Sequence, residues 1–125
     1  MKRLTVLYDP ECELCRRARR WLGEQPSHVP LEFVPAGTPA AVERFPELDP
    51  EGTLKQITVV ADDGRVWRGD GAWIMCLWAL RAHRRRAQQF AGPALRPFVR
   101  GFVKQVADKR YRISSWLEKH LESAT

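Results

Sequence analysis

Apolar and amphipathic stretches alternate in the first third of the chain. Leu4 to Tyr8 is an apolar run without strict alternation, which is typical of a strand covered on both faces. The next segment carries apolar residues on one face at helical spacing and arginines on the other, so we expect an amphipathic helix that ends at Gly23. Leu31 to Val34 predicts a second strand. Thr38-Pro39 then predicts the cap and first turn of a short helix that reaches about Phe45.

Turn residues divide the middle of the chain. We expect residues 46–52 to form a loop. Ile57 to Ala61 and Arg65 to Arg68 flank the turn Asp62-Asp63-Gly64, and this pattern predicts an antiparallel hairpin. Gly69-Asp70-Gly71 then caps the next helix. That helix runs from Ala72 to about His83 and is apolar almost all round, so we expect it to be buried centrally.

These elements follow the order β-α-β-α-β-β-α. A helical crossover joins the first two strands, which predicts that they are parallel. Gly92-Pro93 begins a tail in which apolar residues again recur at helical spacing, and a last helix is expected from Ser114 to about Glu122. The length suits a single domain. We therefore expect one α/β domain over residues 1–125, with a core at about 3–86 and a helical extension at about 92–122.

The segment between the first strand and the first helix carries the candidate chemistry. Asp9-Pro10-Glu11 has the residue types of a helix start, and Cys12 and Cys15 follow with two residues between them. A Cys-x-x-Cys at the first turn of a helix brings two sulfurs within disulfide reach and predicts a redox-active dithiol. The first thiol then lies near unpaired N–H groups and the positive end of the helix dipole, which favour the thiolate that attacks disulfides.

The two cysteines are expected to differ in role. Cys12 lies nearer the end of the helix among polar residues, so we assign it as the nucleophile, and Cys15, one turn deeper, as the resolving thiol. Asp9 has two interpretations: it caps the helix, or it accepts the proton of Cys15 during resolution. Acidic residues near Cys12 raise its pKa, whereas the helix dipole and the arginines at 16 and 17 lower it. The sequence leaves the sign of that shift open.

The cysteines have two further interpretations besides a redox-active dithiol. The pair could be two inert thiols at this spacing by coincidence. A structural zinc site needs four ligands, and the chain has no second Cys-x-x-Cys and only scattered histidines, His28, His83 and His120, so we expect no metal and no other cofactor. Cys76 lies in the most apolar helix and is expected to be a buried core residue.

Composition and charge bound the possible partners. The content of 44% hydrophobic and 29% charged residues is ordinary for a globular protein, whereas the net charge of +6 favours acidic partners. The basic run from Arg81 to Arg86 raises a nucleic-acid-binding module as an alternative. No nucleic-acid-binding motif accompanies it, and we interpret it as a solvated helix C-terminus, so no specific nucleic acid is expected. A protein-interaction module that has kept a redox fold is a third class.

The cellular setting can be predicted in outline. Three cysteines exclude a complete disulfide framework. Met1-Lys2-Arg3 precedes too short an apolar run for a signal peptide, and the longest apolar run, Ala72 to Leu80, is far shorter than a membrane span. We therefore expect a cytoplasmic protein with no membrane span that acts on a disulfide-containing protein or a small thiol.

The motifs together resemble those of the DCC family, which are small thiol-disulfide oxidoreductases of the thioredoxin-like superfamily. The matching segments are Asp9-x-x-Cys12-x-Leu14-Cys15, Asp63-Gly64-Arg65-Val66, Asp70-x-Ala72 and Lys109-Arg110-Tyr111-Arg112. The resemblance implies a thioredoxin-like fold and thiol–disulfide exchange at the dithiol. Two positions depart from it: Pro10 replaces the usual glycine, and Lys55-Gln56-Ile57 lacks the cis-proline that thioredoxins place before the third strand. Because a cis bond without proline costs about 3 kcal/mol, we expect an ordinary trans loop there.

Overall fold

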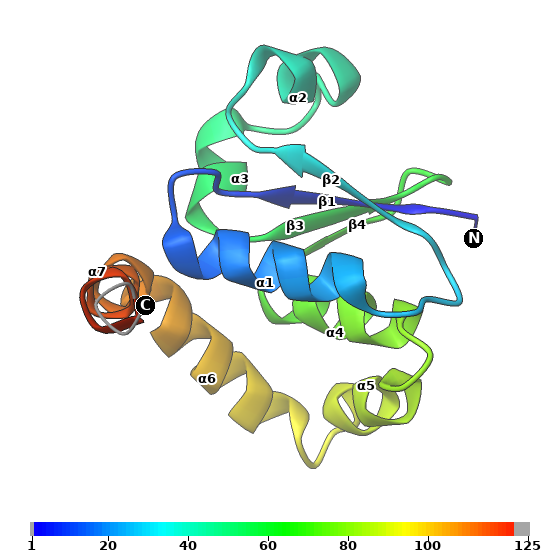
Figure 1. Ribbon diagram of the computed structural model, residues 1–125. Coiled ribbons are helices and arrows are strands. Elements are labelled where there is room, and N and C mark those ends of the chain that lie inside the picture. Colours follow the sequence, from blue (N-terminus) through cyan, green and yellow to red (C-terminus); the bar gives the residue numbers. More distant parts are fainter. Residues whose placement is uncertain (1, 122–125) are drawn as a thin grey trace.

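A four-stranded mixed sheet forms the centre of the computed structural model, which describes residues 2–121 (Figure 1). Its strands are β1 (Leu4–Tyr8), β2 (Leu31–Pro35), β3 (Thr58–Ala61) and β4 (Val66–Arg68), in the order β2-β1-β3-β4. β1 pairs parallel with β2 and antiparallel with β3, and β3 and β4 form an antiparallel hairpin. The predicted parallel pair and the predicted hairpin are both confirmed. Gly64 takes the positive φ of +93° that the tight turn between β3 and β4 requires.

Helices cover both faces of this sheet. They are α1 (Glu13–Glu24), α2 (Pro39–Arg44), α3 (Pro50–Lys55), α4 (Asp70–Ala79), α5 (Arg84–Ala91), α6 (Arg96–Asp108) and α7 (Arg110–Leu121). Figure 1 shows α1 and α4 on one face and α2 and α3 on the other. This mixed α/β arrangement is consistent with a thioredoxin-like fold that carries additional C-terminal helices. In the part of the chain that the structure describes, no helix has the length and hydrophobicity needed to cross a bilayer.

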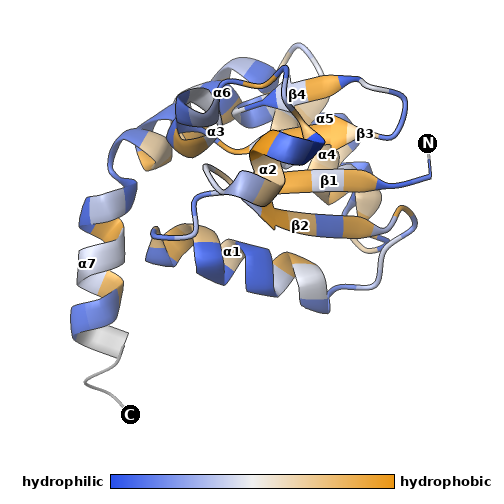
Figure 2. Cartoon of the chain, turned by 90° about the horizontal axis from the view of Figure 1, so that it is seen from above, coloured by the Kyte–Doolittle hydropathy of each residue, from blue (hydrophilic) through white to orange (hydrophobic). Residues whose placement is uncertain are grey.

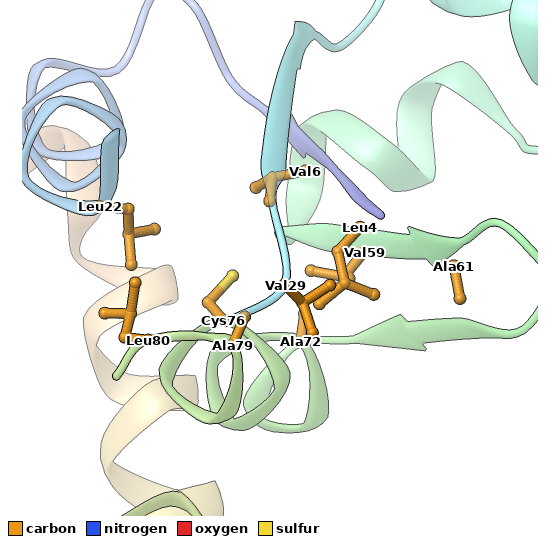
Figure 3. Packing of buried hydrophobic residues seen from close by; sticks show 10 residues of the cluster. All are labelled: Leu4, Val6, Leu22, Val29, Val59, Ala61, Ala72, Cys76, Ala79 and Leu80. Carbon is orange, nitrogen blue, oxygen red and sulfur yellow. The ribbon is translucent and has the colours of Figure 1, made fainter. Parts of the chain in front are cut away.

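Two apolar clusters bind these layers together. Neighbouring residues of a strand point to opposite faces, so β1 supplies Val6 to one cluster and Leu7 to the other. The larger cluster joins β1 and β3 to α1 and α4, and its side chains are drawn in Figure 3. Cys76 of α4 belongs to it and is fully buried, as expected for a core cysteine. The smaller cluster lies on the α2 and α3 face. The predicted burial of β1 on both faces is therefore confirmed.

The expectation of a loop over residues 46–52 is partly wrong, because α3 begins inside it at Pro50. The Asp49 side chain caps this helix by accepting a hydrogen bond from the Glu51 amide at 3.3 Å, and Pro50 occupies the first turn. Thr38 and Pro39 open α2 in the same way, with the Thr38 hydroxyl accepting from the Ala41 amide. The sequence signal for α3 was therefore present at Asp49 but was followed by few apolar residues.

The predicted helix from Ala72 to His83 is also wrong at its C-terminal end. α4 ends at Ala79, and Leu80 takes an extended conformation, is fully buried and pairs with Ser27 in an isolated bridge. Burial of Leu80 thus ends α4 before the basic run begins. Arg84 to Arg86 form the first turn of α5, so the interpretation of this run as a helix C-terminus is incorrect.

The C-terminal tail forms two helices, as its apolar spacing predicts. α6 contacts α4, and α7 packs beside the N-terminal end of α1 (Figures 1 and 2). α7 begins at Arg110, four positions before the predicted start at Ser114, and the predicted end at Glu122 lies outside the described residues. Phe98 and Phe102 of α6 are 76% and 71% exposed, so the apolar face of this helix is only partly covered.

Candidate dithiol site

The turn between β1 and α1 differs from the predicted helix start. Pro10 and Glu11 form a turn, and Asp9 stabilises it, because its Oδ1 accepts a hydrogen bond from the Glu11 amide at 3.0 Å. The helix begins only at Glu13. Its N-cap is Cys12, whose Sγ accepts a hydrogen bond from the Cys15 amide at 3.3 Å. Asp9 is therefore not the helix cap; the sulfur of Cys12 takes that place.

This position favours the thiolate of Cys12. The pKa of Cys12 is lowered from 9.0 to about 6, and its hydrogen bond with the Cys15 side chain contributes most to this shift. Burial and the negative charge of Asp9 raise the pKa, whereas the Cys15 amide and the Ser114 hydroxyl lower it further. The pKa of Cys12 is thus lowered, because hydrogen bonds to the sulfur outweigh its burial. The sequence had left the direction of this shift open.

Cys15 shifts in the opposite direction. Its hydrogen bond to Cys12, its burial and the adjacent negative charge of Cys12 all raise the pKa of the Cys15 thiol. Arg110 opposes this shift through its positive charge. The two sulfurs therefore form an unequal pair, in which Cys12 ionises while Cys15 keeps its proton and donates it to the neighbouring thiolate.

The expected difference in depth is reversed. Cys12 is fully buried, whereas Cys15, expected to lie deeper, is only partly buried. The reason is α7, which lies against the first turn of α1 and places the Ser114 hydroxyl 3.6 Å from the Cys12 Sγ. This contact joins residues that are 102 positions apart in the chain, so no local sequence pattern predicts it.

Three residues of α7 complete the surroundings of the dithiol. Arg110 forms an ion pair with Asp9, at 3.6 Å between Nη2 and Oδ2, and Tyr111 donates its hydroxyl hydrogen to the same carboxylate oxygen. The bond to Asp9 raises the pKa of Tyr111. Ser114 accepts a hydrogen bond from the Leu14 amide at 3.1 Å. The sequence showed Arg110 and Tyr111 only as part of a motif without a role, and it gave no sign of Ser114.

A small cavity of about 30 Å³ lies on the Cys15 side of the site. Asp9, Cys15 and Arg110 line it together with apolar side chains of β1, α1 and α4. Its volume suffices for about one water molecule but not for a peptide. A substrate disulfide therefore cannot be held inside the site as the structure shows it, and has to approach from the surface.

Comparison with known proteins adds one finding. The sequence model of the DCC1-like thiol-disulfide oxidoreductase family matches residues 6–116. The chain belongs to this family. The match includes Asp9, Cys12 and Cys15, and it extends through Ser114 of α7. No curated protein and no solved structure matches the chain.

The loop before β3 of this DCC1-like protein also has a specific partner. Lys55-Gln56-Ile57 contains no proline, and none of the described residues forms a cis peptide bond. Instead, Arg110 reaches this segment from α7 and donates hydrogen bonds to the carbonyl oxygens of Lys55 and of Leu54, the latter at 2.7 Å. The segment that faces the dithiol is thus held by a side chain of the C-terminal helix.

The remaining candidate residues lie apart from the dithiol. Cys76 is in the core, where burial raises the pKa of its thiol to about 12. Within residues 2–121, no group of three or more histidine, cysteine, aspartate or glutamate side chains is placed to hold a metal ion. Of the basic run, Arg84 binds the end of α4, since its Nε donates to the Trp78 carbonyl at 3.0 Å and its guanidinium lies over the Trp78 ring. This arginine has a structural role.

Proposed function

We propose that this protein catalyses thiol–disulfide exchange with Cys12 as the attacking thiol and Cys15 as the resolving thiol. One observation carries the proposal: the Cys12 sulfur caps α1 and accepts the Cys15 amide, with its pKa lowered to about 6, while that of Cys15 is raised. A thiolate is the nucleophile in disulfide exchange, so at neutral pH the pair has one sulfur ready to attack and one that holds its proton.

The reaction has two displacements. The Cys12 thiolate attacks one sulfur of the substrate disulfide, forms a mixed disulfide and releases the other sulfur as a thiolate. Cys15 then loses its proton and attacks the Cys12 sulfur, which forms the Cys12–Cys15 disulfide and releases the second substrate thiolate. The substrate gains two electrons and the dithiol loses two. A thiol reductant has to restore the dithiol, and with an oxidising partner the same steps run in reverse.

Asp9 is proposed as the acceptor of the Cys15 proton. Its carboxylate is 5% exposed, and it lines the cavity on the Cys15 side, which is large enough for about one water molecule. A water molecule in this cavity would connect the Asp9 carboxylate to the Cys15 thiol and carry the proton between them. Arg110, paired with the same carboxylate, keeps a positive charge beside Cys15 as the second thiolate forms.

The proposed substrate is a disulfide-containing protein or a small disulfide, and the electron donor is a thiol. No cofactor beyond the dithiol is required by these steps. We propose that the reaction takes place in the reducing cytoplasm, where thiols are kept reduced.

Trapping of the mixed disulfide tests the assignment of the two cysteines. The full chain with Cys15→Ser is expected to form a covalent adduct with a biotinylated peptide disulfide, and dithiothreitol should release the peptide. The matched variant Cys12→Ser should form far less, because burial still raises the pKa of the remaining Cys15 thiol when the Cys12 sulfur is gone. Equal trapping by both variants, or by neither, would show that the roles are wrongly assigned.

A further inference from the structure

Ser114 connects the C-terminal helix to the reacting sulfur. It lies on α7, is 5% exposed, and its hydroxyl oxygen lies 3.6 Å from the Cys12 Sγ. The same oxygen accepts a hydrogen bond from the Leu14 amide at 3.1 Å and donates to the Arg110 carbonyl at 2.6 Å. One buried hydroxyl therefore contacts the first turn of α1, its own helix and the candidate nucleophile.

When Cys12 loses its proton, at least one hydrogen bond among these groups has to change direction. A serine hydroxyl has one hydrogen to donate and can accept two hydrogen bonds. While Cys12 is a thiol, its S–H can donate to Ser114, and the Ser114 hydrogen goes to the Arg110 carbonyl. A thiolate has no hydrogen and only accepts. The contact at 3.6 Å then persists as a hydrogen bond only if Ser114 supplies the hydrogen.

We propose that Ser114 is a catalytic hydroxyl supplied by α7, which turns its hydrogen from the Arg110 carbonyl to the Cys12 sulfur when that sulfur becomes a thiolate. The proposal rests on the proposed function, in which Cys12 attacks the substrate. The Arg110 carbonyl tolerates the loss, because the helical amide four residues later, that of Ser114 itself, also points toward it.

The charged groups around Cys12 do not replace this hydroxyl. Asp9 in the turn repels the thiolate, and Arg16 on α1 attracts it from a partly exposed position while paired with Glu13. On α7, Arg110 and Tyr111 are engaged by Asp9. The hydrogen bonds to the Cys12 sulfur come from Cys15, through its amide and thiol, and from Ser114.

The proposal links the position of α7 to the chemical state of the dithiol. The thiolate binds Ser114 and so favours the docked helix. Cys12 is fully buried beside Ser114, so a substrate disulfide can reach it only after neighbouring side chains move. Once the mixed disulfide forms, the sulfur carries no charge, and the attraction that held Ser114 is lost. α7 is therefore held most firmly over the free thiolate and less firmly during the reaction.

Titration of the Cys12 thiolate tests the proposal without a substrate. Thiolate absorbance near 240 nm is followed against pH in the reduced full chain, and the curve of Cys12→Ser is subtracted. The step between pH 4 and 8 reports Cys12, because the pKa values of the other two thiols are raised. Ser114→Ala should move the midpoint to higher pH, and a rise of about one pKa unit would lower the thiolate fraction at pH 6 from about one half to about one eleventh, roughly fivefold.

Two comparisons separate the hydroxyl from the packing of α7. Ser115→Ala removes the exposed neighbouring hydroxyl and should leave the midpoint unchanged. Ser114→Thr and Ser114→Val have similar volume and differ in the hydroxyl, so only the valine variant should lose thiolate. Equal midpoints for threonine and valine, or for Ser114→Ala and the wild type, would overturn the proposal. The trapping experiment is scored separately: a normal titration without a trapped adduct contradicts the proposed function alone.

Discussion

The Cys12 side chain performs two tasks with one atom. N-caps are usually Ser, Thr, Asp or Asn, whose oxygen accepts an amide hydrogen near the start of the helix. In this chain the Cys12 sulfur accepts the Cys15 amide, and this bond also stabilises the thiolate. The usual preference for an oxygen-bearing N-cap therefore predicted Asp9 as the cap, whereas the helix begins about one turn later, after Cys12. The group that begins the helix and the proposed nucleophile are the same.

A dependence of stability on pH follows from the lowered pKa of Cys12. Between about pH 6 and 9 the unfolded chain binds a proton at Cys12 that the folded chain does not, so folding is stabilised as pH rises through this window. The contribution is complete above pH 9 and is lost as pH falls through 6. The unfolding free energy of the reduced wild type minus that of Cys12→Ser should rise by up to about 1.4 kcal/mol per pH unit.

Urea unfolding of both proteins at several pH values measures this difference. Cys76→Ala serves as the control, because burial raises the pKa of Cys76 to about 12 and its ionisation affects stability only above pH 9. Parallel pH profiles for wild type and Cys12→Ser would contradict a stabilised thiolate at Cys12.

Among the elements, α7 contributes most to the site although it is farthest from the dithiol in the chain. Its first turn binds the carbonyl oxygens at the end of α3 through Arg110, and it binds the turn before α1 through Asp9. The sequence departs from thioredoxins, in which a cis-proline segment faces the dithiol, because it has no proline directly before β3. Here the equivalent segment has its carbonyl groups occupied by an arginine. The C-terminal helix thus both shapes the site and covers it.

Removal of the Tyr111 hydroxyl should loosen this cover. Tyr111→Phe keeps the ring but deletes the hydrogen bond to Asp9, at a cost of about 1 kcal/mol to the docked helix. Iodoacetamide labelling of Cys12 at pH 8, measured by peptide mass spectrometry, should become about fivefold faster. Arg112→Gln, an exposed change on the same turn, should leave the rate unaltered. An unchanged rate in Tyr111→Phe would show that Tyr111 does not hold α7 over the dithiol.

At the scale of the whole molecule, the sequence predicted what local pattern encodes. The apolar run of β1, the hairpin turn at Gly64 and the spacing of Cys12 and Cys15 are local signals, and each led to the observed element. The end of α4 was mispredicted because it depends on the burial of Leu80 in the larger apolar cluster and on its bridge to Ser27, which lies far away in the sequence. The placement of Ser114 against Cys12 depends on a contact across 102 residues, which a single sequence does not display.

The basic charge of the chain should give only weak binding to nucleic acid. Arg84 of the basic run is already engaged by Trp78, and Arg85 and Arg86 are exposed on the first turn of α5 without a base-reading motif. Binding to a mixed-sequence duplex should therefore fall steeply between 50 and 200 mM salt and show no sequence preference, because such contacts depend on counterion release. Fluorescence anisotropy with two unrelated duplexes measures both properties. Sequence-selective binding at physiological salt would favour the nucleic-acid-binding alternative.

The three thiols should report two different opening events of the molecule. Cys76 lies in the larger apolar cluster between the sheet and α4, so its labelling requires the core to open. Cys12 is equally buried, but part of its cover is Ser114 of α7, whose hydrogen bonds to the site can break while the core stays intact. Iodoacetamide labelling of native protein should therefore modify Cys12 well before Cys76. Labelling of Cys15 should be slow although it is partly exposed, because its pKa is raised.

The dependence of these labelling rates on urea separates the two opening events. Low urea should raise the labelling rate of Cys76 in proportion to global unfolding and change that of Cys12 little. Equal urea dependence of Cys12 and Cys76 would mean that α7 leaves the dithiol only when the whole domain unfolds, and a substrate disulfide would then have no route to Cys12 in the folded protein.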